Sequence, residues 1–184
     1  MRIISGIRKG LKLKPPEGMG TRPTTDRVKE SVFNIIQPYL PARRVLDLFA
    51  GSGALGLEAL SRHSDLCVFT EKDRAAYNLV KHNIELADFS DKSELIFTDA
   101  LAYLSSARIP FDIIFLDPPY NKGLLSPVLE KIHSQNLLNQ DGIIVVETEK
   151  GGEYAEHPDY KVIKQAAYGK TIITVLMRGE TQCV

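Results

Sequence analysis

The sequence predicts an α/β domain in which a mostly parallel, doubly wound sheet ends in an antiparallel hairpin, preceded by a small N-terminal β-hairpin extension. From Arg43 onward, short apolar runs alternate with segments of helical periodicity, which is the rhythm of successive βαβ units. The last two apolar runs are joined closely through Tyr168 and Gly169, so their strands must be antiparallel. With 184 residues, 43% of them hydrophobic, the chain is long enough to bury one ordinary core.

Each element of the body follows from a local pattern. Apolar residues recur at helical spacing from Val28 to Tyr39, and Thr24, Thr25 or Asp26 is available as the N-cap of that helix. The other expected helices cover residues 54–62, 74–87, 100–106 and a stretch around 125–132, and the expected strands cover residues 44–49, 66–71, 93–98, 112–116, 142–148 and the two halves of 160–178.

A basic extension precedes this body. The segments "RIIS" and "LKLK" flank the turn-rich "GIRKG", which predicts a hairpin with Arg8 and Lys9 near its tip. A Pro/Gly-rich joint follows, so we divide the single compact domain into a hairpin extension at residues 1–20 and a main body at residues 21–184. The first 30 residues hold eight Lys or Arg against three acids, a net charge of +5, and the remainder carries −5. Attraction for a polyanion is therefore expected at the N-terminus.

Composition and spacing also argue against several classes of protein. No apolar stretch approaches the roughly 18 residues that a membrane helix needs, and the N-terminus lacks the apolar core of a signal peptide, so we expect a cytoplasmic protein without a membrane partner. Neither the two cysteines, Cys67 and Cys183, nor the four scattered histidines have the spacing of metal ligands. We expect no metal, and we expect Cys67 to be a buried core residue.

A glycine-rich loop follows the first predicted strand of the body. In "VLDLFAGSGALG", Gly51, Gly53 and Gly56 form the pattern G-x-G-x-x-G, and Glu71 follows at the end of the next strand. Glycines allow a tight turn and a close approach of the backbone to a ligand, and the acid can bind ribose hydroxyls. The pattern predicts a nucleoside-containing cofactor without deciding which one. A nicotinamide dinucleotide is one reading.

Asp47 favours a different cofactor. It lies inside the strand, four residues before the glycines, where a loop that binds pyrophosphate gains nothing from a further negative charge. S-adenosylmethionine carries an ammonium and a sulfonium group and no phosphate, so a carboxylate suits it. Asp99, at the end of the third strand, could accept a hydrogen bond from an adenine amino group or could cap the helix that follows it, and one residue can do both.

The segment "FDIIFLDPPY", residues 111–120, ends a buried strand abruptly. Each proline removes a backbone donor and fixes its own φ, so the strand must stop at Leu116 or Asp117. A rigid cluster of an acid and an aromatic ring then lies at the carboxyl end of a strand, which is where ligands bind in open α/β sheets.

Taken in order, these motifs resemble those of the class I S-adenosylmethionine-dependent methyltransferases that act on exocyclic amino groups of nucleic-acid bases. With the N-terminal block "RIISGIRKGLKL…TRPTTDRVKESVFNII", the chain is similar to the bacterial family that methylates N2 of a guanine in small-subunit (16S) ribosomal RNA. The resemblance covers Arg2 to about Met177. It implies a Rossmann-like fold, S-adenosylmethionine as cofactor, S-adenosylhomocysteine as product and the small ribosomal subunit or its rRNA as partner. We expect a monomer.

The resemblance also assigns roles to residues. The target base would be flipped into the pocket and stacked on Tyr120, while the Asp117 carboxylate and the Pro118 carbonyl accept its amino hydrogens and Pro119 keeps the cluster stiff. The candidate cofactor-binding residues are Asp47, Phe49, Gly51, Gly53, Glu71, Lys72, Asp99, Ala100, Thr24 and Asn34. The candidates for contact with RNA phosphates, chosen for their charge and place in the N-terminal block, are Arg8, Lys9, Arg22 and Arg27.

Alternatives remain at this point. The tetrapeptide Asp117 to Tyr120 is shared with enzymes that methylate adenine N6 or cytosine N4 in DNA. A nicotinamide-dependent oxidoreductase would use the glycine loop alone. A non-catalytic RNA-binding module would leave the tetrapeptide unexplained.

Overall fold

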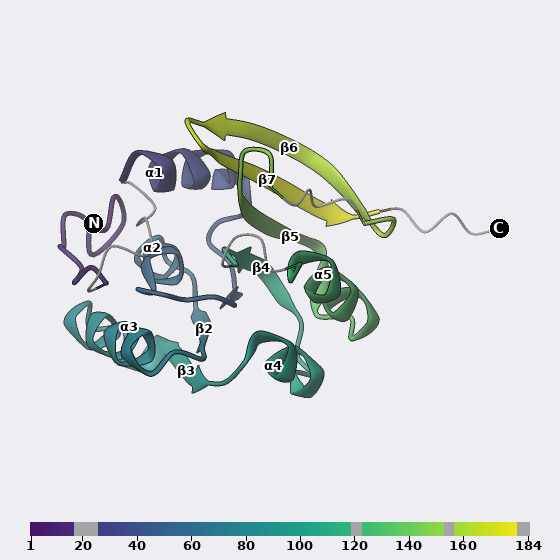
Figure 1. Cartoon of the computed structure of the whole chain (residues 1–184). Coiled ribbons are helices and arrows are strands. Elements are labelled where there is room, and N and C mark those ends of the chain that lie inside the picture. Colours follow the sequence, from purple (N-terminus) through teal and green to yellow (C-terminus); the bar gives the residue numbers. More distant parts are fainter. Residues whose placement is uncertain (17–25, 119–122, 153–156, 180–184) are drawn as a thin grey trace.

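The computed structural model describes residues 1–16, 26–118, 123–152 and 157–179, and its centre is a seven-stranded sheet with the strand order β3-β2-β1-β4-β5-β7-β6 (Figure 1). The strands are β1 (Arg44–Asp47), β2 (Leu66–Glu71), β3 (Ser93–Phe97), β4 (Phe111–Leu116), β5 (Leu138–Glu149), β6 (Tyr160–Tyr168) and β7 (Thr171–Arg178). The helices are α1 (Asp26–Ile35), α2 (Ala54–Ser61), α3 (Arg74–Leu86), α4 (Ala100–Ser106) and α5 (Leu125–Ser134), with short 3-10 turns η1 (Gln37–Tyr39) and η2 (Ser90–Lys92).

The first five strands pair in parallel, and β7 pairs antiparallel with both β5 and β6. This confirms the predicted doubly wound sheet with a terminal hairpin. The strand order reverses between β1 and β4, because the chain first builds outward through β2 and β3 and then returns to the other side of β1. Such a switch point opens a crevice at the carboxyl ends of the strands.

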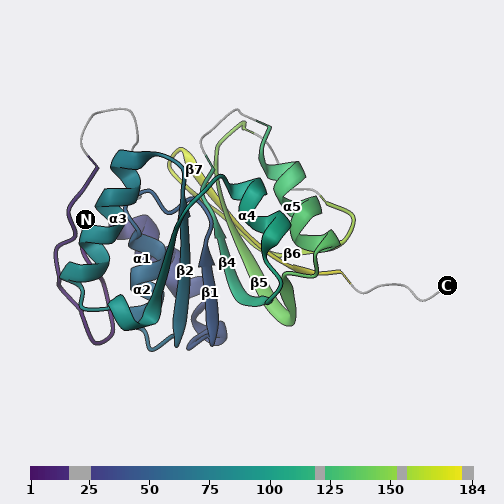
Figure 2. The ribbon, with the colours of Figure 1, turned by 90° about the horizontal axis from the view of Figure 1, so that it is seen from below.

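Two apolar layers sandwich the sheet. Figure 2 shows α1, α2 and α3 on one side of it and α4 and α5 on the other. From Ile113 in β4 and Ile143 in β5 onward, odd-numbered residues such as Phe115 and Val145 belong to the cluster under α1 and α2, whereas even-numbered residues such as Leu116 and Val146 pack with α4 and α5. The alternation follows from the period of two in a strand, and it also fixes the face of the residues that continue β4 and β5.

The N-terminal segment, residues 1–16, lies against α2 and α3. It is shaped like a hairpin, held by an antiparallel bridge between Arg2 and Lys12 and by turns within residues 5–10. The backbone N–H groups of Ile4 and Ser5 donate to the two carboxylate oxygens of Glu58 on α2, at 2.7 and 3.0 Å. The extension therefore packs on the main body by hydrogen bonds at its core-facing side. The predicted boundary at residue 20 lies outside the described residues.

Within the described residues, no helix is both long and apolar enough to cross a bilayer. The predicted burial of Cys67 is confirmed, since its side chain is wholly inaccessible.

Candidate active site

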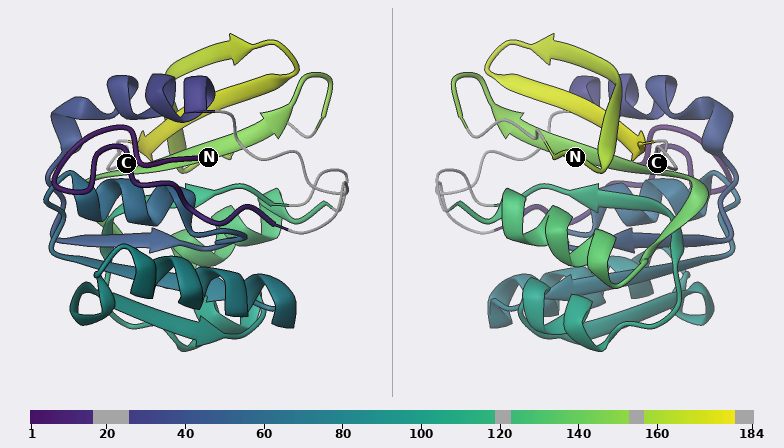
Figure 3. Two further views of the ribbon diagram at one scale, coloured as in Figure 1. Left: turned by 90° about the vertical axis from the view of Figure 1, so that its left-hand side faces the viewer. Right: turned by 90° about the vertical axis from the view of Figure 1, so that its right-hand side faces the viewer.

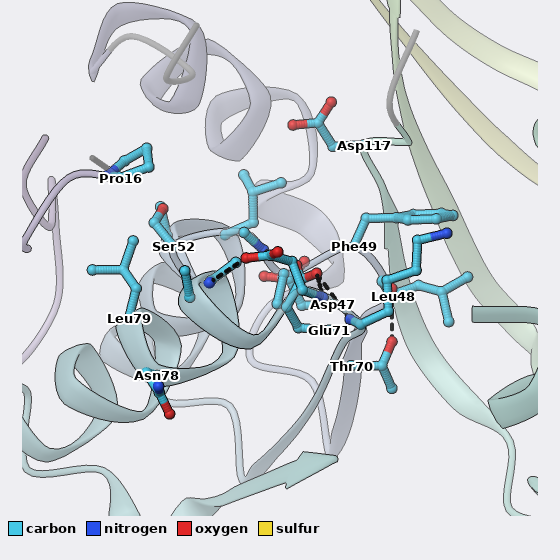
Figure 4. Close-up of a pocket in the computed structure, with 18 of the residues that line it drawn as sticks. Pro16, Asp47, Leu48, Phe49, Ser52, Thr70, Glu71, Asn78, Leu79 and Asp117 are labelled. Carbon is cyan, nitrogen blue, oxygen red and sulfur yellow. Dashed lines mark hydrogen bonds between the residues drawn. The ribbon is translucent and has the colours of Figure 1, made fainter. Parts of the chain in front are cut away.

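A cavity of about 780 Å³ opens at the carboxyl ends of β1, β2, β3 and β4, at the switch point of the sheet. In Figure 4, Asp47 and Glu71 lie near the centre of the view and Asp117 lies above them. Pro16, Ser52 and Leu79 lie to their left. Among the predicted site residues of the described part, the cavity is lined by Asp47, Phe49, Gly51, Glu71, Lys72, Asp99, Ala100, Asp117 and Pro118.

The glycine loop joins β1 to α2 through two residues with left-handed backbone. Gly51 has φ +57° and Gly53, the residue that precedes α2, has φ +76°, conformations that side chains rarely allow. Gly56 has a different role, because a Cβ atom there would lie 2.3 Å from the ring of Phe69 on β2. The first two glycines shape the loop, and the third lets α2 pack closely on the sheet.

Asp47, the last residue of β1, connects this strand to the first turn of α2. Its side chain is 3% exposed, and its Oδ2 atom accepts the backbone N–H of Gly56 at 3.0 Å. Burial raises the pKa of Asp47 to about 7, against the lowering effect of that hydrogen bond and with some help from the negative charge of Glu71. A carboxylate in such surroundings is stabilised by a cation brought next to it.

Glu71 ties the glycine loop to the turn after β2. Its Oε2 accepts the backbone N–H of Gly51 at 3.0 Å, and its Oε1 accepts the N–H groups of Lys72 and Asp73 at 2.9 and 2.8 Å. A carboxylate has about four lone-pair positions. The three bonds orient the group firmly and leave it capacity to accept from a ribose hydroxyl.

Asp99 caps α4, as one of the two sequence readings expected. Its Oδ1 accepts the N–H of Leu101 at 3.0 Å, and its Oδ2 lies 3.3 Å from Nζ of Lys72. Although partial desolvation opposes it, hydrogen bonding from Leu101 and from Lys72 lowers the pKa of Asp99. The adenine role is not tested by these contacts, and it stays a prediction.

Asp117 directly follows β4. Within the described residues, its carboxylate accepts no hydrogen bond. Burial raises the pKa of Asp117 well above its ordinary value, and the nearby carboxylates of Glu147 and Asp47 raise it further. All three acids continue odd-numbered positions of their strands, so they lie on the same face of the sheet.

The charges of the cavity fit S-adenosylmethionine better than a dinucleotide. Five acids line it against two lysines, and the lining acids are Asp47, Glu71, Asp73, Asp99 and Asp117. Of the amides in the glycine loop, that of Gly51 already donates to the Glu71 carboxylate and that of Gly53 to the carbonyl of Ala50. A sulfonium and an ammonium group are favoured in this field, whereas two phosphates would be repelled.

Several contributors to the site were missed by the sequence reasoning. Met1, Lys14 and Pro15 of the N-terminal segment line the cavity together with Ser52 of the glycine loop. Asn83, fully buried on α3, connects the two: its Nδ2 donates to the carbonyls of Lys14 and Ser52 at 3.1 and 2.9 Å. Its Oδ1 accepts the N–H of Lys14 at 2.9 Å. A lone Asn in a helical pattern carries no signal that would have indicated this role.

The remaining predicted site residues do not line the cavity or lie outside the described ranges. Asn34 is exposed near the end of α1 and is not among the residues that line the cavity, and neither is Gly53. Arg8 is half-buried, and its guanidinium donates to the carbonyl of Ala87 and forms an ion pair with Asp88. Lys9 and Arg27 are exposed. The predicted residues outside the described ranges are Thr24, Arg22, Pro119 and Tyr120.

Within the described ranges, no three His, Cys, Asp or Glu side chains gather in a way that could hold a metal ion.

The chain is similar to known proteins over nearly its whole length. A family model described as Conserved hypothetical protein 95 matches residues 1–177. Ribosomal RNA small subunit methyltransferase D of Haemophilus influenzae is 37% identical over 172 residues, covering 92% of this chain and 89% of that protein. The protein of the same name from Escherichia coli is 39% identical over 150 residues, covering 81% and 75%.

Solved structures agree with these relatives. The Escherichia coli protein yhhF is 34% identical, covers 97% of both chains and superposes with a TM-score of 0.86. The SAH-bound Podospora anserina methyltransferase PaMTH1 is 17% identical and superposes with a TM-score of 0.68 over 85% of this chain and 80% of that one. At 17% identity, the similarity to PaMTH1 shows a shared fold and no more.

Proposed function

The chain belongs to the family described as Conserved hypothetical protein 95 and is an S-adenosylmethionine-dependent class I methyltransferase, and from this premise we propose that it methylates the exocyclic N2 of a guanine in small-subunit rRNA. The nicotinamide alternative does not fit, because the relatives are methyltransferases and the Glu71 carboxylate takes the amide of Gly51 in the glycine loop.

The observation that carries the proposal is the Asp117 carboxylate at the end of β4. It lines the cavity with Pro118 and accepts no hydrogen bond within the described part of the chain. The carboxylate is partly exposed to the cavity, so its oxygens can accept hydrogen bonds from a donor that enters with a ligand. An exocyclic amino group brings two N–H donors.

The chemistry asked of this chain is mainly positioning. The amino nitrogen of guanine is a poor nucleophile, because its lone pair is delocalised into the ring. Asp117 and the Pro118 carbonyl accept the two amino hydrogens, which favours a more tetrahedral nitrogen and directs its lone pair into the cavity. S-adenosylmethionine supplies the electrophilic methyl group on its sulfonium. Asp47 and Glu71 would hold the cofactor from the side of the glycine loop, and Tyr120 would stack on the base.

The choice of rRNA is supported by the relatives, two of which are named ribosomal RNA small subunit methyltransferase D. The basic N-terminal segment adds an independent argument, since it gives the first 30 residues a charge of +5. Lys9 and Arg27 are exposed there and could contact phosphates, whereas Arg8 is engaged within the protein.

The test is transfer of labelled methyl groups to unmodified small ribosomal subunits, to naked rRNA and to duplex DNA, followed by identification of the labelled nucleoside. We expect N2-methylguanosine from the rRNA substrates. Label only in DNA adenine or cytosine would refute the substrate and keep the site chemistry.

Variants test the role of Asp117. Asp117→Ala should abolish transfer, and Asp117→Asn, which keeps one oxygen acceptor, should retain part of it. Because the pKa of Asp117 is raised in the ligand-free protein, wild-type kcat/KM should increase with pH as this acid ionises, whereas the Asn variant should lack that rise. Asp112→Asn is the matched control, since Asp112 lies on β4 and, among the described residues, its carboxylate accepts from the backbone N–H of Arg44 and the amide of Asn139. Full activity of Asp117→Ala would refute the proposal.

A further inference from the structure

Two lysines project beyond the catalytic edge of the sheet. Lys150 directly follows β5. Lys170 lies with Gly169 in the turn between β6 and β7, directly before β7. The two are neighbours, because Glu149 pairs with Thr171 and the backbone N–H of Lys150 donates to the carbonyl of Lys170 at 2.7 Å. Figure 3 shows the end of β5 and the β6–β7 turn at the same end of the sheet. Both side chains are exposed.

The register places these lysines relative to Asp117. Leu116 pairs with Val146 in parallel, so Asp117 lies level with Glu147. Lys150 is three residues further along β5, which at a rise of about 3.3 Å per residue is roughly 10 Å beyond the level of Asp117 toward solvent. A guanine whose amino group reaches Asp117 holds its ribose and flanking phosphates outward from the cavity, in the direction of the two lysines.

The two lysines attract an anionic partner, although the exposed Glu149 beside Lys150 offsets part of their charge. Like charges on neighbouring strands repel, and within the described residues neither ammonium group has an ion-pair partner. The cavity below them is acidic, so an RNA strand entering it needs cations near its mouth to offset repulsion from the lining acids. Phosphate contacts of this kind position the strand without reading its sequence.

We propose that Lys150 and Lys170 form a phosphate clamp that holds the RNA backbone on either side of the target nucleotide while its base occupies the cavity. This inference rests on the proposed function, because it takes RNA as the substrate. It adds to the basic N-terminal segment a second docking surface, on the opposite side of the cavity mouth along the strand order. The clamp contributes to RNA affinity and not to the binding of the cofactor.

The experiment compares the double variant Lys150→Gln/Lys170→Gln with the control Lys161→Gln/Lys164→Gln, which removes the same charge from exposed positions of β6 away from this turn. The measured quantity is kcat/KM for naked small-subunit rRNA across a series of KCl concentrations. Each phosphate contact to a single strand contributes about 0.7 to the slope of log affinity against log salt, so the clamp variant should lose about 1.4.

Wild-type protein is assayed first, with the labelled nucleoside identified. Wild-type transfer to rRNA guanine with a slope unchanged in the clamp variant overturns the clamp and leaves the proposed function intact. Equal losses in the control variant also overturn it, since they would reflect net charge alone. We expect the clamp variant to keep wild-type kcat at saturating RNA and wild-type affinity for S-adenosylhomocysteine, because neither lysine lines the cavity.

Discussion

Glu58 is the residue whose loss we expect to cost most stability outside the catalytic cavity. It is fully buried on α2, and its carboxylate accepts from Nζ of Lys29 at 3.1 Å and from Nε of Arg62 at 2.9 Å. It also accepts the backbone N–H groups of Ile4 and Ser5. Four donors from three segments therefore meet on one side chain, and about four is all that a carboxylate can take.

The perturbation is Glu58→Gln, which keeps the shape and removes the charge. Lys29 is also completely buried, and desolvation lowers its pKa although Glu58 opposes that change. Removing one partner of a buried ion pair typically costs about 3–5 kcal/mol, because the other charge is left uncompensated. For a chain of this length each kcal/mol lowers Tm by about 2–4 °C, so we expect a drop of roughly 6–20 °C.

Thermal melts followed by circular dichroism measure the effect. The double variant Glu58→Gln/Lys29→Met should recover much of the loss, since a buried pair can often be replaced by apolar groups at little cost. Asp88→Asn is the control: it removes an ion pair with Arg8 whose acid is 87% exposed, and it should cost less than about 1 kcal/mol. A Glu58→Gln melt within about 2 °C of wild type would refute the reasoning.

Three further predictions concern residues under and beside the glycine loop. The pKa of Asp47 is raised to about 7, so the stability that its protonated form gives the ligand-free protein is lost as pH rises through that value. Asp47→Asn should therefore have a higher Tm than wild type at about pH 8 and nearly the same Tm at low pH, and it should bind S-adenosylhomocysteine more weakly. An equal gain in Tm at all pH values would contradict this. Asn83→Asp loses the donors to Ser52 and to the N-terminal segment, and calorimetry should find S-adenosylhomocysteine bound about tenfold more weakly, whereas unchanged affinity would argue against coupling. Gly56→Ala places a Cβ 2.3 Å from the ring of Phe69, so urea unfolding should show a loss of about 1–3 kcal/mol, and wild-type stability would be inconsistent with the packing described.

Much of the fold was predictable from local patterns. Buried parallel strands read as unbroken apolar runs, so the run from Ile113 to Leu116 identified β4, and the prolines after Asp117 identified its end. The hairpin of β6 and β7 followed from the close join at Gly169. In these cases the element can be predicted from the residues that form it, without knowledge of what they pack against.

The site was predictable only where a motif supplied a signal. The glycine loop and Glu71 were found through their spacing, and they do lie together in the cavity. Asn83 and Glu58 could not be found in this way, because each holds the N-terminal segment through contacts with residues more than 50 positions away. Arg8 shows the limit of a charge pattern: its predicted contact with RNA stays a prediction, and the pattern could not reveal that its guanidinium bonds to Ala87 and Asp88 at the end of α3.

The attachment of the N-terminal segment has a consequence for the order in which the protein folds. Residues 2–14 leave the ribosome before their partners Glu58, Ser61 and Asn83, which follow 53 to 69 residues later. Contacts of such long sequence separation form only after the intervening chain is synthesised and its helices are in place. The wall of the cavity built by Lys14 to Pro16 is therefore completed late, and a nascent chain that ends before α3 would have a glycine loop without this wall.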